Sequence, residues 1–73
     1  MSRLPQVSGS DVVRALQKVG FVIRRQHGSL IILRRDDPFA QTVVPNHRQI
    51  DRGTLRAILR QTDLSVDEFT RLL

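Results

Sequence analysis

The chain has 73 residues, no cysteine and a formal charge of +5, with eleven arginines and one lysine against seven acidic residues. We expect one domain over residues 1–73, with a small core that leaves no room for a deep cofactor pocket. The absence of cysteine excludes disulfides and thiolate zinc sites. The excess of arginine predicts an anionic partner, because the planar guanidinium group recognises phosphate and carboxylate through paired hydrogen bonds.

The distribution of apolar residues argues against a membrane or secreted protein. No apolar run approaches the roughly 18 residues of a membrane-spanning helix, and the amino terminus lacks the apolar region of a signal peptide. A cysteine-free chain is also compatible with a reducing compartment. We therefore expect a cytoplasmic protein with no membrane partner and no cofactor.

The first predicted element is a short amphipathic helix. Ser10 is its predicted N-cap, Asp11 suits the positive end of its dipole, and Gly20 is the expected left-handed residue that ends it. Between these signals the apolar side chains recur at helical spacing, at Val12, Ala15, Leu16 and Val19.

Three strands are predicted to follow. The apolar runs 21–23 and 30–33 predict an antiparallel hairpin, whose expected turn is His27-Gly28-Ser29. Residues 36–39 contain a proline and predict a second turn, after which residues 41–44 predict the third strand. These strands would form a three-stranded antiparallel meander.

A second helix is predicted to begin near Arg52. Asp51 is a candidate cap, although Gly53 and Thr54 are expected to weaken the first turn. The residues that would face the core recur at helical spacing, at Leu55, Ile58 and Leu59.

Ser65 and Glu68 have the spacing of a capping box, which predicts a short last helix that buries Phe69 and Leu72. The predicted order is α-β-β-β-α-α. Strands followed by helices, without βαβ alternation, indicate an α+β fold with helices on one face of the sheet.

The second predicted strand is apolar on both faces. Ile31 and Leu33 would point to one side of the sheet, while Leu30, Ile32 and Arg34 would point to the other. Aliphatic side chains on the open face predict that another chain covers it, or that the amino-terminal segment folds over it.

The hairpin also carries the first candidate site. A histidine can take the proton from a ribose 2′-hydroxyl, and arginines can neutralise the charge that grows on the attacked phosphate. The alternative is an ordinary turn histidine. The residues that the predicted hairpin would gather for this chemistry are His27, Arg24, Arg25, Ser29, Arg34 and Arg35.

His47 and Arg48 form a second candidate group, in the loop after the third predicted strand. His47 is interpreted either as an auxiliary proton-transfer or phosphate-contacting residue, or as a loop residue hydrogen-bonded to backbone. Two histidines without cysteine, together with carboxylates that lack ligand spacing, predict no metal site.

Arg52, Arg56 and Arg60 repeat every four residues along the second predicted helix and would form a basic ridge. No acidic residue lies between Asp51 and Asp63 to pair with them along the helix. The ridge is interpreted either as a phosphate-binding surface or as an ordinary solvated helix face.

The order of these motifs resembles the HicA (YcfA-like) family of toxin ribonucleases from toxin-antitoxin pairs. The resemblance implies a fold like the double-stranded-RNA-binding domain, metal-independent cleavage of mRNA (an mRNA interferase), and neutralisation by a HicB-like antitoxin. It extends over nearly the whole chain and rests on Ser10–Leu16, Lys18–Phe21, Arg25–Ser29, Val43–His47, Arg52–Leu59 and Leu64–Phe69.

One position departs from the family pattern. The family's catalytic histidine follows the Gly-Ser pair, and Leu30 stands there in this chain. Leucine transfers no proton, so three accounts stay open: a naturally inactive homologue, a site that uses His27 or His47 instead, or an introduced change. The sequence thus predicts a HicA-like toxin that binds RNA and acts as a metal-independent endoribonuclease, with a catalytically inactive RNA-binding or antitoxin-binding homologue as the alternative.

Overall fold

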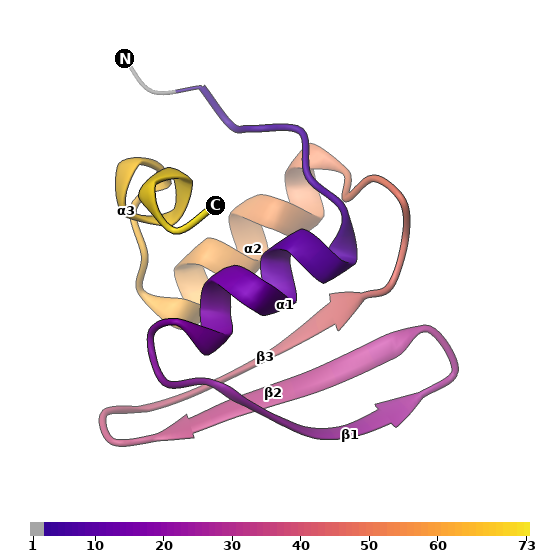
Figure 1. Cartoon of the computed structure of the whole chain (residues 1–73), viewed down its shortest axis with the longest axis vertical. Helices are drawn as coiled ribbons and strands as arrows, with labels where there is room; N and C mark the ends of the chain where they lie inside the picture. The colour runs from indigo at the N-terminus through magenta and orange to yellow at the C-terminus, as the bar shows by residue number, and fades with distance from the viewer. Residues whose placement is uncertain (1–2) are drawn as a thin grey trace.

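Three strands and three helices follow one another in the predicted order. The strands form one antiparallel sheet in the order β1-β2-β3, and α1 and α2 lie on the same side of it (Figure 1). The predicted α+β fold is therefore confirmed. The computed structural model describes residues 3–73, with α1 at Gly9–Gln17, β1 at Val22–His27, β2 at Leu30–Asp36, β3 at Phe39–Pro45, α2 at Arg52–Thr62 and α3 at Val66–Arg71.

The N-cap of α1 lies two residues before the predicted one. The Ser8 hydroxyl accepts a hydrogen bond from the Asp11 N–H, and the Asp11 carboxylate accepts one from the Ser8 N–H, both at 3.1 Å. This reciprocal pair requires a serine three residues before the acid, so the prediction of Ser10 as the cap is wrong. At the other end Gly20 has a φ of 95°, as expected for the residue that ends the helix.

Asp51 caps α2 as predicted. One of its carboxylate oxygens accepts from the Thr54 N–H at 3.1 Å, and the other accepts from the Thr54 hydroxyl at 2.6 Å. Thr54 therefore strengthens the first turn, and the expectation that it weakens the turn is wrong. With 11 residues α2 is the longest helix, and no helix of residues 3–73 is long and apolar enough to span a membrane.

The predicted capping box of α3 is confirmed. The Glu68 N–H donates to the Ser65 hydroxyl at 3.0 Å, while the Ser65 N–H donates to the Glu68 carboxylate at 2.8 Å. This cap orients a six-residue helix so that Phe69 is completely buried and Leu72 packs partly buried against the core.

These three caps predict that the fold loses stability in acid. Hydrogen bonds from Ser8, Thr54 and Ser65 lower the pKa of Asp11, Asp51 and Glu68, respectively, below the ordinary values of 3.8, 3.8 and 4.5. A lowered folded-state pKa adds stability above the unfolded-state pKa, and that stability is lost as the pH falls through the folded value. We expect the urea midpoint to fall between about pH 5 and pH 2. Asp51→Asn should have a smaller pH-dependent loss; an identical loss would contradict this account.

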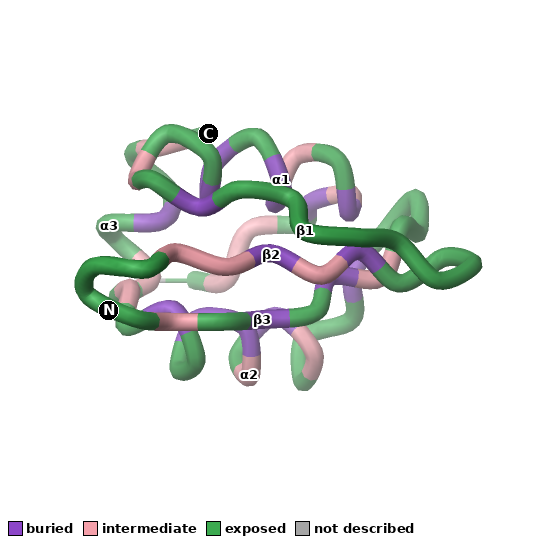
Figure 2. Tube along the Cα trace, turned by 90° about the horizontal axis from the view of Figure 1, so that it is seen from below, coloured by how far each residue is buried: buried purple, intermediate pink, exposed green. Residues whose placement is uncertain are grey.

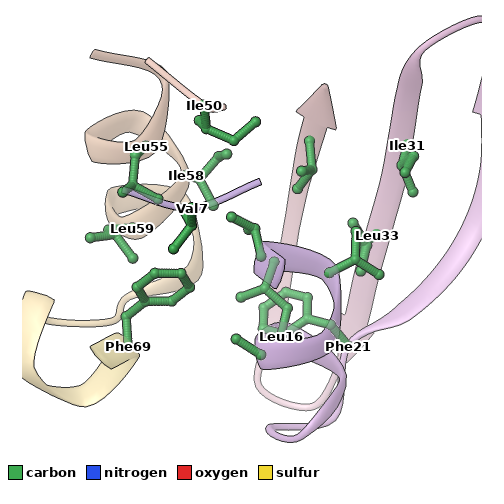
Figure 3. Close-up of a cluster of buried hydrophobic side chains, with 14 residues drawn as sticks. Val7, Leu16, Phe21, Ile31, Leu33, Ile50, Leu55, Ile58, Leu59 and Phe69 are labelled. Atoms are coloured by element: carbon green, nitrogen blue, oxygen red, sulfur yellow. The ribbon is translucent and has the colours of Figure 1, made fainter. Parts of the chain in front are cut away.

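The core lies between the helices and one face of the sheet. Ile31 and Leu33 point into it from β2, as predicted, and both are buried. Figure 3 shows Leu33 close to Leu16 of α1, with Phe69 of α3 in the same apolar cluster. The core therefore draws on all three helices and fixes which face of the sheet is hidden.

The other face of the sheet, here called the open face, has no helix over it. Figure 2 looks at the sheet from this side, with the helices behind it. Residues paired across antiparallel strands point to the same side, so the register defines the members of the open face. Leu30 and Val43 are 45% and 40% exposed there, and the predicted outward direction of Leu30 and Ile32 is confirmed.

The amino-terminal segment does not cover the open face in the described part of the chain. Val7 is buried in the core, and its carbonyl accepts a hydrogen bond from the Ile50 N–H at 2.8 Å. Leu4 also packs against the core. Residues 3–8 thus follow the helical side of the molecule, and the prediction that the amino-terminal segment folds over the exposed aliphatic side chains is wrong for them.

Candidate nucleic-acid interface

His27 lies at the end of β1, directly opposite Leu30 at the start of β2. The turn between them contains only Gly28 and Ser29, so the predicted three-residue turn is wrong by one residue. Gly28 has a φ of 57° and occupies the first central position, which is glycine in a type II′ hairpin. As a strand residue His27 points to the open face, with its Cβ about 5 Å from that of Leu30.

The loop after β3 is tied to the hairpin tip and to α1. The Asn46 N–H donates to the Ser29 carbonyl at 2.6 Å, and the Gly9 N–H donates to the His47 carbonyl at 2.8 Å. A Cβ at position 9 would collide with the backbone of Pro45 and Asn46, so this close approach requires glycine. The main chain at His47 is therefore held through both its N–H and its carbonyl, and the residue itself is exposed in the loop after β3.

A β-bulge brings two neighbouring arginines to the open face. Ile23 pairs with Leu33, but the next pair is Arg25 with Ile32, so Arg24 is an extra residue in β1. A bulge of this kind interrupts the usual alternation and redirects a side chain. Both arginines consequently line one cavity of about 280 Å³, together with Ile32, Arg34 and Gln41.

This cavity, here called the arginine cavity, carries an excess of positive charge. The Arg34 Nε lies 3.0 Å from a carboxylate oxygen of Asp36, which offsets one of the three guanidinium charges. Within residues 3–73, Arg24 and Arg25 take part in no ion pair. Two uncompensated guanidinium groups beside an apolar floor at Ile32 suit a ligand that is anionic on one side and apolar on the other.

The open face therefore holds a histidine and a cationic cavity in succession. Leu30, Ile32 and Arg34 are alternate residues of β2, spaced about 7 Å apart along the strand. His27 stands beside the first of them, and the cavity surrounds the second and third. Across the described part of the chain, no cluster of three or more His, Cys, Asp or Glu side chains is arranged to hold a metal ion.

A comparison with protein families identifies the chain. The family described as HicA toxin of bacterial toxin-antitoxin matches residues 9–64, which is more than half of the 73 residues. The chain belongs to the HicA toxin family. It is a toxin of a toxin-antitoxin system, and its family implies an antitoxin as partner. No curated protein matches the chain.

In this HicA toxin, Arg35 does not belong to the open face. Its guanidinium lies over the Phe21 ring, 4.6 Å from the ring centroid, and donates hydrogen bonds to the carbonyls of Val19 at 3.3 Å and Pro38 at 2.9 Å. These contacts join the end of α1 to the turn between β2 and β3. Arg35 is thus separated from the other candidate arginines of the hairpin and has a structural role.

Of the remaining candidate residues, Ser29 lies in the two-residue turn next to His27, whereas the arginines come from the loop after β3 and from α2. Arg48 is exposed in the loop after β3, and Ser29 forms the hairpin tip. Arg52 lines a hollow of about 1030 Å³ beside the amino-terminal segment, and Arg56 and Arg60 line one of about 860 Å³ between α2 and α3. Both hollows lie on the helical side, so the basic ridge of α2 and the arginine cavity of this toxin are separate surfaces.

One exposed residue of the open face, Phe39, was not among the site residues predicted from the sequence. Phe39 pairs with Asp36 at the end of β3, so it points to the same side as the arginine cavity, and it is 69% exposed. The other two phenylalanines, Phe21 and Phe69, are buried in the core. The signal in the sequence was the alternation of Phe39, Gln41 and Val43, which was obscured because Phe39 was assigned to the preceding turn.

Proposed function

We propose that this HicA toxin binds mRNA on the open face and cleaves it without a metal ion, with His27 as the general base. The observation that carries the proposal is the pairing of His27 with Leu30. The resemblance to toxin ribonucleases assigns a catalytic histidine to position 30, and His27 is the cross-strand neighbour of that position on the same face, with its Cβ about 5 Å away. We also propose that the antitoxin is of the HicB type and that the toxin acts in the cytoplasm, where mRNA is found.

The proposed reaction uses the RNA's own 2′-hydroxyl as nucleophile. His27 accepts the proton of this hydroxyl, whose oxygen attacks the adjacent phosphorus, and the bond from phosphorus to the 5′-oxygen breaks. The leaving oxygen takes a proton from water, giving a 2′,3′-cyclic phosphate and a 5′-hydroxyl. Arg25 and Arg34 would stabilise the negative charge on the phosphate during the attack.

Leu30→His provides the test of this assignment. The toxin and the variant are incubated with mRNA in EDTA, and the products are analysed for cyclic phosphate ends. We expect slow cleavage by the toxin and faster cleavage by Leu30→His, because the variant restores an imidazole at the family position. If the toxin is inert while Leu30→His cleaves strongly, the general-base role of His27 is eliminated.

The second candidate function is an RNA-binding or antitoxin-binding protein that does not cleave. Leu30 itself favours it, since a 45% exposed leucine contributes apolar contact and no proton transfer. RNA that stays intact while its affinity falls steeply with salt would support this candidate, because phosphate contacts release counterions.

A further inference from the structure

We propose that the open face binds single-stranded RNA along a track from Phe39 to His27, on which Phe39 stacks against a base and the arginine cavity holds a neighbouring phosphate. The inference rests on the proposed function, since it names the form of RNA that this surface accepts. It adds a base-stacking residue and a phosphate subsite to the His27 region.

The register places these groups along one continuous line. Phe39 lies opposite Asp36, Gln41 opposite Arg34, and Val43 opposite Ile32. Leu30, opposite Pro45 and His27, closes the line at the other end. Asp36 follows Leu30 by six positions along β2, so the line is about 20 Å long. An extended strand of a few nucleotides has the length to reach from Phe39 across the cavity to His27.

The chemistry of the line favours unpaired bases over a duplex. Exposed Phe39 lies at one end of the cationic cavity, and exposed Val43 and Leu30 lie toward its other end. This arrangement matches a strand of RNA that offers both base faces and phosphates. A duplex hides its base faces by stacking and pairing and presents mainly phosphates and 2′-hydroxyls. An exposed phenylalanine on a sheet is the kind of platform on which single-stranded RNA stacks.

The cavity supplies the phosphate site next to this platform. Arg34 and Gln41 form the pair adjacent to Asp36 and Phe39 along the strands, and both line the cavity with Arg24 and Arg25. Asp36 already holds the Nε of Arg34, leaving the terminal nitrogens of that guanidinium for a ligand. A base on Phe39 would therefore place its neighbouring phosphate among the guanidinium groups.

Stacking on Phe39 is tested with an RNA that the toxin cannot cleave. The probe is 2′-O-methyl oligouridine, which lacks the nucleophilic hydroxyl, and its affinity is measured by fluorescence anisotropy. Phe39→Ala is expected to weaken binding at least about 5-fold and Phe39→Tyr to retain it, because stacking requires the ring. Leu73→Ala is the matched control, since Leu73 is 50% exposed and lies at the end of the chain beyond α3.

A tryptophan at the same position reports the stacking directly. The chain contains no tryptophan, so Phe39→Trp introduces a single indole fluorophore. We expect the uridine oligomer to quench its fluorescence, and an oligomer of the same length without bases to leave it unchanged. Leu73→Trp should not respond to either oligomer.

The phosphate subsite is tested through the salt dependence of binding. Removing one phosphate contact to a single strand lowers the slope of log affinity against log salt by about 0.7. The double variant Arg24→Gln/Arg25→Gln should show this decrease, whereas Arg56→Gln/Arg60→Gln, on the helical side, should keep the parent slope.

The outcomes separate this inference from the proposed function. One contrary result would be an RNA affinity that stays the same in Phe39→Ala and in Arg24→Gln/Arg25→Gln but falls in Arg56→Gln/Arg60→Gln. It would overturn the proposed track on the open face, while the proposal that the toxin binds RNA would stand. Preference for a duplex of the same length would also overturn it. If the parent toxin neither binds nor cleaves RNA, both proposals fail. If Phe39→Ala weakens only the antitoxin complex, the open face is a protein interface and the track is excluded.

Discussion

Replacing His27 by alanine is expected to slow RNA cleavage by about 10²- to 10⁴-fold, the usual contribution of a general base. His27 is exposed on the open face, so its removal leaves the core intact. His27 is paired directly with Leu30, whereas His47 lies in the loop after β3, where its carbonyl accepts a hydrogen bond from the Gly9 N–H of α1. Single-turnover cleavage in EDTA, with the circular dichroism spectrum as a check on folding, measures the effect.

His47→Ala is the matched control for this experiment. It removes the other imidazole of the chain from a residue that is also exposed, without changing the backbone bonds that His47 makes to Pro45 and Gly9. We expect cleavage by His47→Ala to stay within about 10-fold of the parent rate, well above that of the His27 variant. The reverse ranking of the two variants would assign the base to His47.

The second large effect concerns stability. Phe69→Ala is expected to lower the free energy of unfolding by about 3–5 kcal/mol, because the ring is completely buried and its loss leaves a cavity. Domains of this kind have about 5–15 kcal/mol of stability in total, so the variant should be partly unfolded at physiological temperature. Urea unfolding of the parent and the variant at 25 °C measures the difference.

Leu73→Ala again serves as the control, and we expect its free energy of unfolding to lie within about 0.5 kcal/mol of the parent value. Comparing Phe69→Ala with Leu73→Ala tests whether α3 unfolds together with the rest of the domain. Phe69 lies beyond residue 64, where the match to the HicA toxin family ends, and yet it belongs to the same core as Leu16 and Leu33. A loss below about 1 kcal/mol for Phe69→Ala would mean that α3 is an independent appendage.

The arrangement of helices and sheet in layers was predictable because apolar residues recur at regular spacing in the helices and in β2. Apolar spacing places α1 and α2 on the core, and alternation in β2 separates Ile31 and Leu33 from Leu30 and Ile32. The ends of the helices were harder to predict. Two serines lie within the three residues before Asp11, and only the reciprocal hydrogen bonds of the capping box distinguish Ser8 from Ser10. Local composition favours both residues equally, and the difference is one of three-dimensional geometry.

The candidate site was only partly predictable for a similar reason. His27, Arg25 and Arg34 share a face because of strand register, and the hairpin motif implied that they were near one another. The role of Arg35 depends on Phe21 and Val19, which approach it only in the folded chain. The side of the sheet on which Phe39 lies could be predicted only from the exact length of the turn between β2 and β3. One residue more or fewer in that turn would place the Phe39 side chain on the opposite face.

Because of the bulge at Arg24, the two Arg-Arg dipeptides of the hairpin direct their side chains differently. Arg34-Arg35 follows regular alternation and sends one cation to each side of the sheet, whereas both residues of Arg24-Arg25 line the same cavity. Loss of a single residue from this bulge would restore regular pairing, keep His27 opposite Leu30, and remove one positive charge from the surface. The length of β1, as well as its composition, therefore sets how strongly this face attracts an anion.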